Sequence, residues 1–389
     1  MDTNTATTSA PTRPLTDWLT AQPVGVRPEV IAEAAIDASV VSLGVNTRES
    51  HELFEFVAET TDLLIKHGFT TLAIQDNQRV ADLFDRYITG ADIDIDYALA
   101  QAWGAWQIAE MRQALVRLRE HNRSRTGAPV RIIGIVEPRA LLEDYDRIIE
   151  LLAGIDEPTA ATVEEFFTTI RVAHSGGEHV LRAHGTHPGT PFVELAQTAH
   201  DTAAGLPPSA ERDAALELLD GVVAFHADAV GVGHDRAKEE RIAADRILEH
   251  HRRTTERTVV WDGSTHIAAH PSEMFGAHLS AELGDKYVAV HTFFGQGDIE
   301  RATIPAPKEG SLDAELAAAD KELTVDLAAP MPSEAAEQLA QSWSMRIISG
   351  MYDPARDADH YFELPSVTES FDLLVYFPRI TPAEPLTDA

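Results

Sequence analysis

The chain of 389 residues contains no cysteine, and its 31 lysines and arginines are outnumbered by 63 aspartates and glutamates. The lack of cysteine excludes disulfides, thiolate nucleophiles and every cysteine-based zinc or iron–sulfur site. The formal charge of −32 disfavours nucleic acid and anionic membranes as partners, because binding to either requires basic residues that displace counterions. We therefore expect neither as a partner.

Long apolar segments are also missing. No stretch of 18 or more residues is apolar, so a transmembrane helix is not expected. Residues 1–14 are polar, lack the hydrophobic segment of a secretory signal and are expected to form a disordered tail, which makes the cytoplasm the default location. The apolar content of 44% is nevertheless enough to build a large buried core.

Six short apolar runs rich in β-branched residues predict strands. Runs that are apolar at consecutive positions are typical of strands buried on both faces, as in a parallel sheet. Stretches with helical spacing separate them, such as Ser50–His67, which Gly68 is placed to end. The alternation predicts an α/β fold with a mostly parallel sheet flanked by helices. The strands are expected at Ala38–Gly44, Thr70–Gln75, Val130–Val136, Arg257–Asp262, Lys286–Phe294 and Asp372–Phe377.

The middle of the chain, residues 138–254, shows helical patterns and no convincing strand. We predict that it is a large helical insertion or cap in one α/β core, which would comprise residues 15–137 and 255–389. A separately folding helical domain is the alternative. The helices are expected at Ala140–Ala153, Ala161–Ala173, Pro191–Ala204, Ala210–Val230 and Asp235–His251.

Polar and titratable side chains follow several predicted strands, at the carboxyl ends where open parallel sheets bind ligands. The segments concerned include Asn46–Glu52, Gln75–Arg79 and Asp262–His266. The simpler interpretation is that these loops are polar because loops face solvent. Gly295–Gly297, after the fifth predicted strand, is expected to form a tight turn that lets the backbone approach the cleft.

Four histidines and a glutamate in the insertion suggest a metal site: His174, Glu178, His179, His184 and His187. Glycine and proline interleave them, and neither an HExxH nor a His-x-His motif occurs. A lid loop is therefore favoured over a zinc site, and we expect no metal and no other cofactor.

The motifs at the strand ends resemble those of the erythromycin esterase family, also labelled succinoglycan-biosynthesis-like, from Pro14 to Leu386. The family motif Leu-Gly-Glu-x-x-His-Gly-Thr-x-Glu-Phe-Phe corresponds to Leu43–Phe54, and a strand ending in Trp-Ala-His-Asn-x-His corresponds to Trp261–His266. Further matches in the same order are Gly68-Phe69, Gly276–Leu279, Gly284–Tyr287, Gly295–Gly297, Phe371-Asp372 and Pro385-Leu386. The resemblance implies a metal-independent hydrolase of esters or lactones that activates water with a cluster of histidines and glutamates.

Four positions depart from the family pattern. Two glutamates and two histidines of the cluster are replaced, in this sequence by Val45, Gln75, Arg48 and Gly263. Each replacement removes a proton acceptor, so the ordinary hydrolytic mechanism is not expected to be intact. Of the motif residues, Glu52 and His266 remain.

The resemblance implies three catalytic candidates. We predict that His266 is the base or proton relay, that Arg48 stabilises anionic charge, and that Glu52 orients one of them or acts as an acid or base. The alternatives are a histidine that only shapes the pocket, an Arg48 salt bridge to Glu49 or Glu52, and a Glu52 carboxylate that is favoured by the helix dipole.

A small natural-product substrate is expected to contact Asn46, His51, Gln75 and Asp262. His51 is a candidate substitute for the missing histidine, and the alternative role of Gln75 and its neighbours is to cap the next helix through Asn77. Two other functions remain open. The pocket could serve a secondary-metabolite tailoring enzyme that catalyses isomerisation, cyclisation or elimination, or it could belong to an inactive binding homologue.

Overall fold

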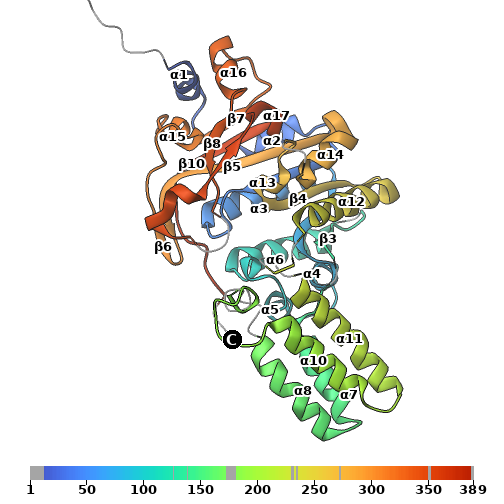
Figure 1. The fold of residues 1–389 in the computed structure, drawn as a ribbon. Coiled ribbons are helices and arrows are strands. Elements are labelled where there is room, and N and C mark those ends of the chain that lie inside the picture. Colours follow the sequence, from blue (N-terminus) through green and yellow to red (C-terminus); the bar gives the residue numbers. More distant parts are fainter. Residues whose placement is uncertain are drawn as a thin grey trace, which may run out of the picture. The chain divides into compact units, whose positions relative to one another are not determined.

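The structure is a computed structural model, and it describes residues 13–125, 127–137, 139–171, 181–228, 232–233, 235–270, 273–348 and 352–386. The chain forms two compact units (Figure 1). The first unit contains Met1–Leu72 and Ile247–Pro385, and the second contains Ala73–Arg246 and Leu386–Ala389.

The first unit is built on a mostly parallel sheet. Its central strand, β1 (Val40–Val45), lies between β4 (Arg257–Gly263) and β5 (Tyr287–Ile299) and is parallel to both. β10 (Leu373–Ile380) is parallel to β5 on the other side. These strands are buried along most of their length, as the continuous apolar runs predicted. The predicted mostly parallel α/β sheet is therefore confirmed.

Four short strands escaped prediction. β7 (Leu323–Asp326) is antiparallel to β10, and β6 (Ala302–Ile304) is antiparallel to β5. β8 (Trp343–Arg346) and β9 (Tyr361–Leu364) form a separate antiparallel pair. Each has only three or four residues, which is too short for an apolar run or an alternating pattern to stand out.

The predicted tight turn at Gly295–Gly297 is wrong, because these residues continue β5. Gly297, with φ +151°, pairs with Ile380 of β10, and a Cβ on it would lie 2.1 Å from the Ile380 carbonyl oxygen. Glycine is needed here for the close approach of a neighbouring strand rather than for a turn.

Helices flank this sheet in the first unit (Figure 1). The long helix α3 (His51–Lys66) begins after Ser50, whose side chain accepts a hydrogen bond from the Leu53 N–H at 3.3 Å. It ends before Gly68 (φ +94°), as predicted. The other helices are α1 (Pro14–Ala21), α2 (Pro28–Ala34), α13 (Ser264–Ile267), α14 (Phe275–Leu283), α15 (Leu312–Ala317), α16 (Ser333–Leu339) and α17 (Val367–Ser370). Residues 1–12 of the predicted tail lie outside the described residues.

The second unit begins within β2 (Phe69–Asn77), which is a hydrogen-bonded neighbour of β3 (Arg131–Val136). Asn77 caps the following helix α4 (Gln78–Ile88) by accepting hydrogen bonds from the Arg79 and Val80 N–H groups, so the predicted capping role of Asn77 is confirmed. After α4 come α5 (Ile95–Ala100), a 3-10 turn at Gly104–Trp106 and α6 (Ala109–Ser124).

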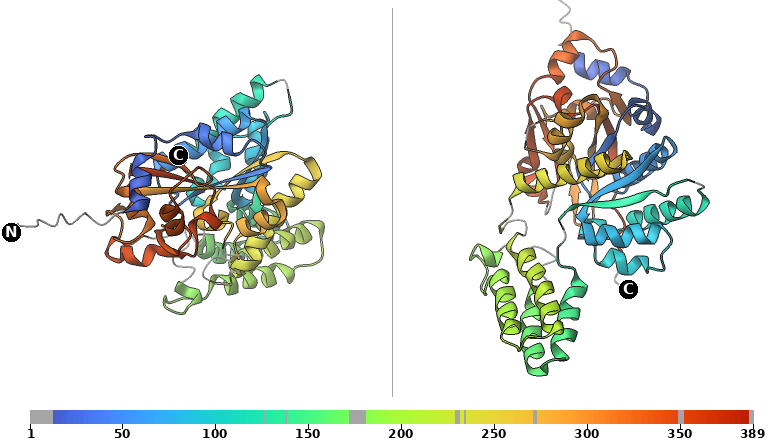
Figure 2. Two further views of the ribbon diagram at one scale, coloured as in Figure 1. Left: turned by 90° about the horizontal axis from the view of Figure 1, so that it is seen from above. Right: turned by 90° about the vertical axis from the view of Figure 1, so that its right-hand side faces the viewer.

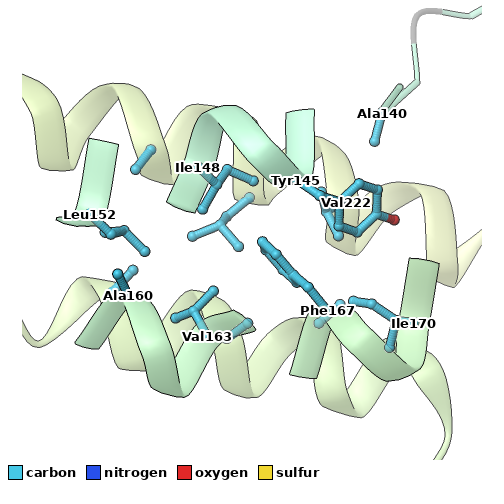
Figure 3. Close-up of a cluster of buried hydrophobic side chains, with 14 of the residues drawn as sticks. Ala140, Tyr145, Ile148, Leu152, Ala160, Val163, Phe167, Ile170 and Val222 are labelled. Atoms are coloured by element: carbon cyan, nitrogen blue, oxygen red, sulfur yellow. The ribbon is translucent and has the colours of Figure 1, made fainter. Parts of the chain in front are cut away.

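Four helices of the second unit form a bundle: α7 (Leu142–Ala153), α8 (Glu157–Ile170), α10 (Phe192–Ala204) and α11 (Ala210–Ala227). The right-hand view of Figure 2 shows them side by side. Their core is apolar because residues such as Tyr145, Ile148 and Leu152 recur one turn apart on the same helix face (Figure 3).

A further helix, α12 (Arg236–Thr254), follows the bundle helices in the chain and precedes β4. The described residues between 139 and 254 thus contain helices and no strand, as predicted for the insertion. None of the described helices has both the length and the apolar content needed to cross a bilayer.

Candidate functional site

A buried ion pair lies at the carboxyl ends of β1 and β4. The Arg48 Nη2 donates to Asp262 Oδ1 at 2.6 Å, and the two side chains are 15% and 1% exposed. The same Asp262 oxygen accepts from the Gly263 N–H at 2.5 Å. Burial lowers the pKa of the Arg48 guanidinium, and the neighbouring Asp262 carboxylate opposes this effect. Arg48 thus pairs with Asp262, which was not among the partners that the sequence suggested.

Gly263 separates this ion pair from His266. A Cβ on Gly263 would lie 3.2 Å from Arg48 Nη2, 3.3 Å from Arg48 Nη1 and 3.3 Å from the His266 Cδ2. The guanidinium and the imidazole therefore flank one small space, which a side chain on residue 263 would fill. His266 lies in α13, directly after β4, and is partly buried. The structure thus brings Arg48, Asp262 and His266 together within the first unit.

Glu52 is directed to a different part of the first unit. Its Oε1 accepts from the Thr381 Oγ1 at 2.6 Å, and its Oε2 accepts from the Thr381 N–H at 2.7 Å and from the Ser50 Oγ at 3.2 Å. Thr381 directly follows β10, so this carboxylate joins the start of α3 to the end of a distant strand.

Asn46 and His51 lie at the two ends of the loop that carries Arg48. Asn46 is 1% exposed, and its Nδ2 donates to the Arg346 carbonyl oxygen at 3.3 Å. The His51 side chain is exposed, and its backbone N–H donates to the Thr381 carbonyl oxygen at 3.0 Å. Both residues are thus used, at least in part, to hold the loop in place.

A buried arginine, Arg346, lies close to Asn46 and was not predicted from the sequence. The Arg346 side chain is fully buried, and its guanidinium donates to the carbonyl oxygens of Gly295 at 2.5 Å and Pro305 at 3.0 Å. Its backbone N–H donates to Asp313 Oδ2 at 2.9 Å. Burial raises the pKa of the Asp313 carboxyl to about 7, although the Arg346 N–H and charge act in the opposite direction. The segment has no motif, and the only signal is an arginine among the apolar residues Met345, Ile347 and Ile348.

Gln75 belongs to the second unit, near the carboxyl end of β2. Its carbonyl oxygen accepts from the Trp106 Nε1 at 3.1 Å. The next residue, Asp76, accepts from the N–H groups of Asn77 at 2.7 Å and Trp103 at 2.9 Å. Burial raises the pKa of Asp76 to about 7, while those two N–H groups lower it. These contacts fix the carboxyl end of β2 to the Trp103–Trp106 segment.

The histidine-rich segment is described only in part. His174, Glu178 and His179 lie outside the described residues. Among the residues that the structure describes, no three or more histidine, aspartate or glutamate side chains group in a way that could hold a metal ion. The choice between a lid and a metal site therefore stays a prediction.

Comparison with known proteins gives a family and a fold. Residues 65–380 match the sequence profile of a family described as erythromycin esterase. No protein of the curated set matches the sequence significantly.

Three solved structures are similar over nearly the whole chain. A protein from Bacillus cereus shares 18% identity with a TM-score of 0.64, over 95% of this chain and 98% of that one. A succinoglycan biosynthesis protein shares 16% identity with a TM-score of 0.65, over 96% of this chain and 98% of that one. A mutant of the erythromycin esterase EreC in its open conformation shares 14% identity with a TM-score of 0.56, over 92% of this chain and 95% of that one. At these identities the likeness concerns the fold alone.

Proposed function

Because the chain belongs to the erythromycin esterase family, we propose that it is a hydrolase that cleaves an ester, a lactone or a related acyl group in a small natural product. One observation carries the proposal. Arg48, Asp262 and His266 converge at the carboxyl ends of β1 and β4, where an open α/β sheet binds its ligands.

The proposed reaction needs one group that moves a proton and one that stabilises negative charge. His266 accepts a proton from water while the water oxygen attacks the acyl carbon, and the carbonyl oxygen becomes an oxyanion. Arg48 donates to this oxyanion. When the intermediate collapses, the bond to the leaving oxygen breaks, and His266 returns the proton to that oxygen. The mechanism that we propose requires no metal or other cofactor.

Asp262 supports Arg48 in this proposal. A guanidinium that is only 15% exposed needs a partner, because an uncompensated buried charge is strongly unfavourable. The carboxylate at 2.6 Å supplies it and also fixes the orientation of the guanidinium plane. A cation held in this way can stabilise charge without reorganising during the reaction.

A second function is favoured by the residues around the ion pair. Val45 and Gly263 are register partners on β1 and β4, and neither has a group that accepts a proton. A site with a fixed cation and few bases suits an acidic intermediate that is isomerised, cyclised or eliminated. We therefore keep a secondary-metabolite tailoring enzyme as the alternative, and a binding homologue as the outcome if no turnover exists.

Untargeted mass spectrometry of a metabolite extract, incubated with the protein in ¹⁸O-labelled water, distinguishes these functions. Hydrolysis predicts a product that carries one oxygen from the solvent. An isomer or an elimination product without the label would favour the tailoring enzyme, and a metabolite that binds but is not converted would favour the binding homologue.

His266→Ala tests the residue assignment, with His67→Ala as a matched control. His67 is an exposed histidine of the same unit, at the end of α3. Loss of a general base should slow turnover by about 10²-fold or more in His266→Ala and leave His67→Ala unchanged. Full turnover by His266→Ala would overturn the assignment.

A further inference from the structure

The loop that carries Arg48 is held on both sides by segments that are distant in sequence. It runs from Asn46, directly after β1, to Ser50, directly before α3. A loop of this length would ordinarily be the mobile part of an α/β unit. Here its backbone and flanking side chains make hydrogen bonds to two other parts of the first unit.

The first clamp joins Asn46 to the end of β8. The Asn46 Nδ2 donates to the Arg346 carbonyl oxygen at 3.3 Å, and the Asn46 carbonyl oxygen accepts from the Ile348 N–H at 2.8 Å. Arg346 is itself fixed, since its guanidinium reaches the carbonyl oxygens of Gly295 and Pro305. The beginning of the loop is therefore hydrogen-bonded to a buried residue whose side chain is held by two carbonyl oxygens.

The second clamp joins Glu49–Glu52 to the chain after β10. The Ala383 N–H donates to the Glu49 carbonyl oxygen at 2.9 Å, and Ser50 forms an antiparallel bridge with Pro382. The Glu52 carboxylate closes this clamp, because its two oxygens accept from the Oγ1 and the N–H of Thr381 at 2.6 and 2.7 Å.

We propose that Glu52 and Arg346 are positioning residues, which hold the loop from both ends so that Arg48 faces Gly263 and His266. Both Glu52 oxygens are engaged by Thr381, so Glu52 acts through the loop rather than as an acid or base. A preorganised loop places the guanidinium before a substrate arrives. The inference rests on the proposed function only in assuming that Arg48 acts on the substrate, since the clamps themselves do not depend on it.

The test measures how often Arg48 is released, and it needs no substrate. Phenylglyoxal modifies accessible arginine side chains, and peptide mass spectrometry gives the rate at Arg48. Glu52→Ala removes three hydrogen bonds to a carboxylate, two of them from Thr381, and should raise this rate about tenfold. Glu52→Gln should stay close to the wild-type rate, because its amide oxygen still accepts from the Thr381 N–H and its NH₂ can donate to the Thr381 Oγ1.

Two isosteric variants provide a matched comparison. Thr381→Val removes the hydroxyl that binds Glu52 and should raise the rate at Arg48 by about threefold. Thr324→Val makes the same substitution elsewhere in the first unit, at a buried threonine of β7 whose hydroxyl accepts from the Arg27 N–H at 2.8 Å, and should leave the rate unchanged. If Glu52→Ala labels no faster than Thr324→Val, the clamp is refuted. Labelling of Glu52→Gln as fast as that of Glu52→Ala would refute it too.

Arg346→Met tests the first clamp in the same assay. Methionine fills much of the same buried volume but makes none of the bonds to Gly295 and Pro305, so labelling of Arg48 should rise several-fold. An unchanged rate in a folded Arg346→Met protein would remove Arg346 from the inference.

Activity gives an independent readout. With a converted metabolite in hand, a positioning role predicts that Glu52→Gln keeps kcat/KM within a few-fold of the wild type, whereas Glu52→Ala lowers kcat. An acid or base role predicts that both variants lose about 10²-fold or more. If the wild type converts nothing, the proposed function fails, but the labelling result still decides whether the loop is clamped.

Discussion

Replacing His291 by leucine should make the free energy of unfolding less dependent on pH between neutral and mildly acidic conditions. His291 lies in β5 with no exposed surface. Its ring stacks on that of Phe371, with the ring centroids 4.7 Å apart, and meets the Phe293 ring edge-on, with the centroids 4.0 Å apart. Within the described part of the chain, neither ring nitrogen has a hydrogen-bond partner. Burial among these rings lowers the pKa of His291 to about 3.

The size of the effect follows from the difference between the folded and unfolded pKa values. The unfolded chain takes up a proton at His291 as the pH falls below about 6.5, whereas the folded protein does not until about 3. The stability that comes from keeping His291 neutral is therefore present above pH 6.5 and is lost as the pH falls. Each pH unit in this window is worth about 1.4 kcal/mol, so the loss should reach about 2 kcal/mol at pH 5.

Urea unfolding at pH 7 and pH 5 measures this difference. The unfolding free energy of His291→Leu, relative to that of the wild type, should increase by about 2 kcal/mol from pH 7 to pH 5. His291→Gln is the matched control, because it keeps a polar side chain that does not titrate. It should show the same pH-dependent gain from a lower starting stability. An advantage that changes by less than about 0.5 kcal/mol in both variants would refute the account of a neutral, unpaired histidine.

Three further predictions concern the packing and charge of the first unit. Gly44→Ala should lower the free energy of unfolding by about 2–3 kcal/mol and Gly263→Ala by about 1 kcal/mol, as urea unfolding would show. The new Cβ on residue 44 would meet the Ile267 Cδ1 at 2.6 Å and the backbone Cα of Ser264 at 2.9 Å, whereas the new Cβ on residue 263 would meet only side-chain atoms, of Arg48 at 3.2 Å and of His266 at 3.3 Å. Gly263→His should destabilise the protein less in the Arg48→His variant than in the wild type. A double-mutant cycle of unfolding free energies should give a coupling of about 1–2 kcal/mol, and additive effects would show that the two side chains do not share space. As the pH rises from 4 to 7, the unfolding free energy of Asp313→Asn should increase relative to the wild type by roughly 1.4 kcal/mol per pH unit. The reason is that the folded carboxyl, with a pKa of about 7, keeps a proton that the unfolded chain releases. A constant difference between the two proteins across this range would contradict the prediction.

The sequence was sufficient for the elements whose residues carry a long, regular signal. The buried strands β1, β4, β5 and β10 were predictable because a parallel strand covered on both faces is apolar at nearly every position. The end of α3 was predictable because Gly68 adopts a φ of +94° that other residues avoid. The bundle helices were predictable because each repeats apolar residues at helical spacing.

The contacts that define the site were beyond the reach of sequence patterns, since they join residues far apart in the chain. Nothing local to Glu52 indicates that its partner is Thr381, 329 positions away. The residues around Arg48 suggested Glu49 and Glu52 as partners but gave no indication of its ion pair with Asp262 on the adjoining strand. Only the strand order and register, which pair Gly44 with Asp262, bring these two residues together.

The residues at the positions in the first unit that depart from the resembled family pattern fit one another, and we therefore propose a rebuilt site rather than a decayed one. An arginine at position 48 needs room and a counter-charge in a place that is almost closed to water. Gly263 leaves the room, because any side chain there would come within 3.2 Å of the guanidinium. Asp262, where the family motif has alanine, supplies the charge at 2.6 Å. Random loss of proton acceptors would not by itself provide a matched pair of this kind, and this is the reason for our proposal that Arg48 still acts on a substrate.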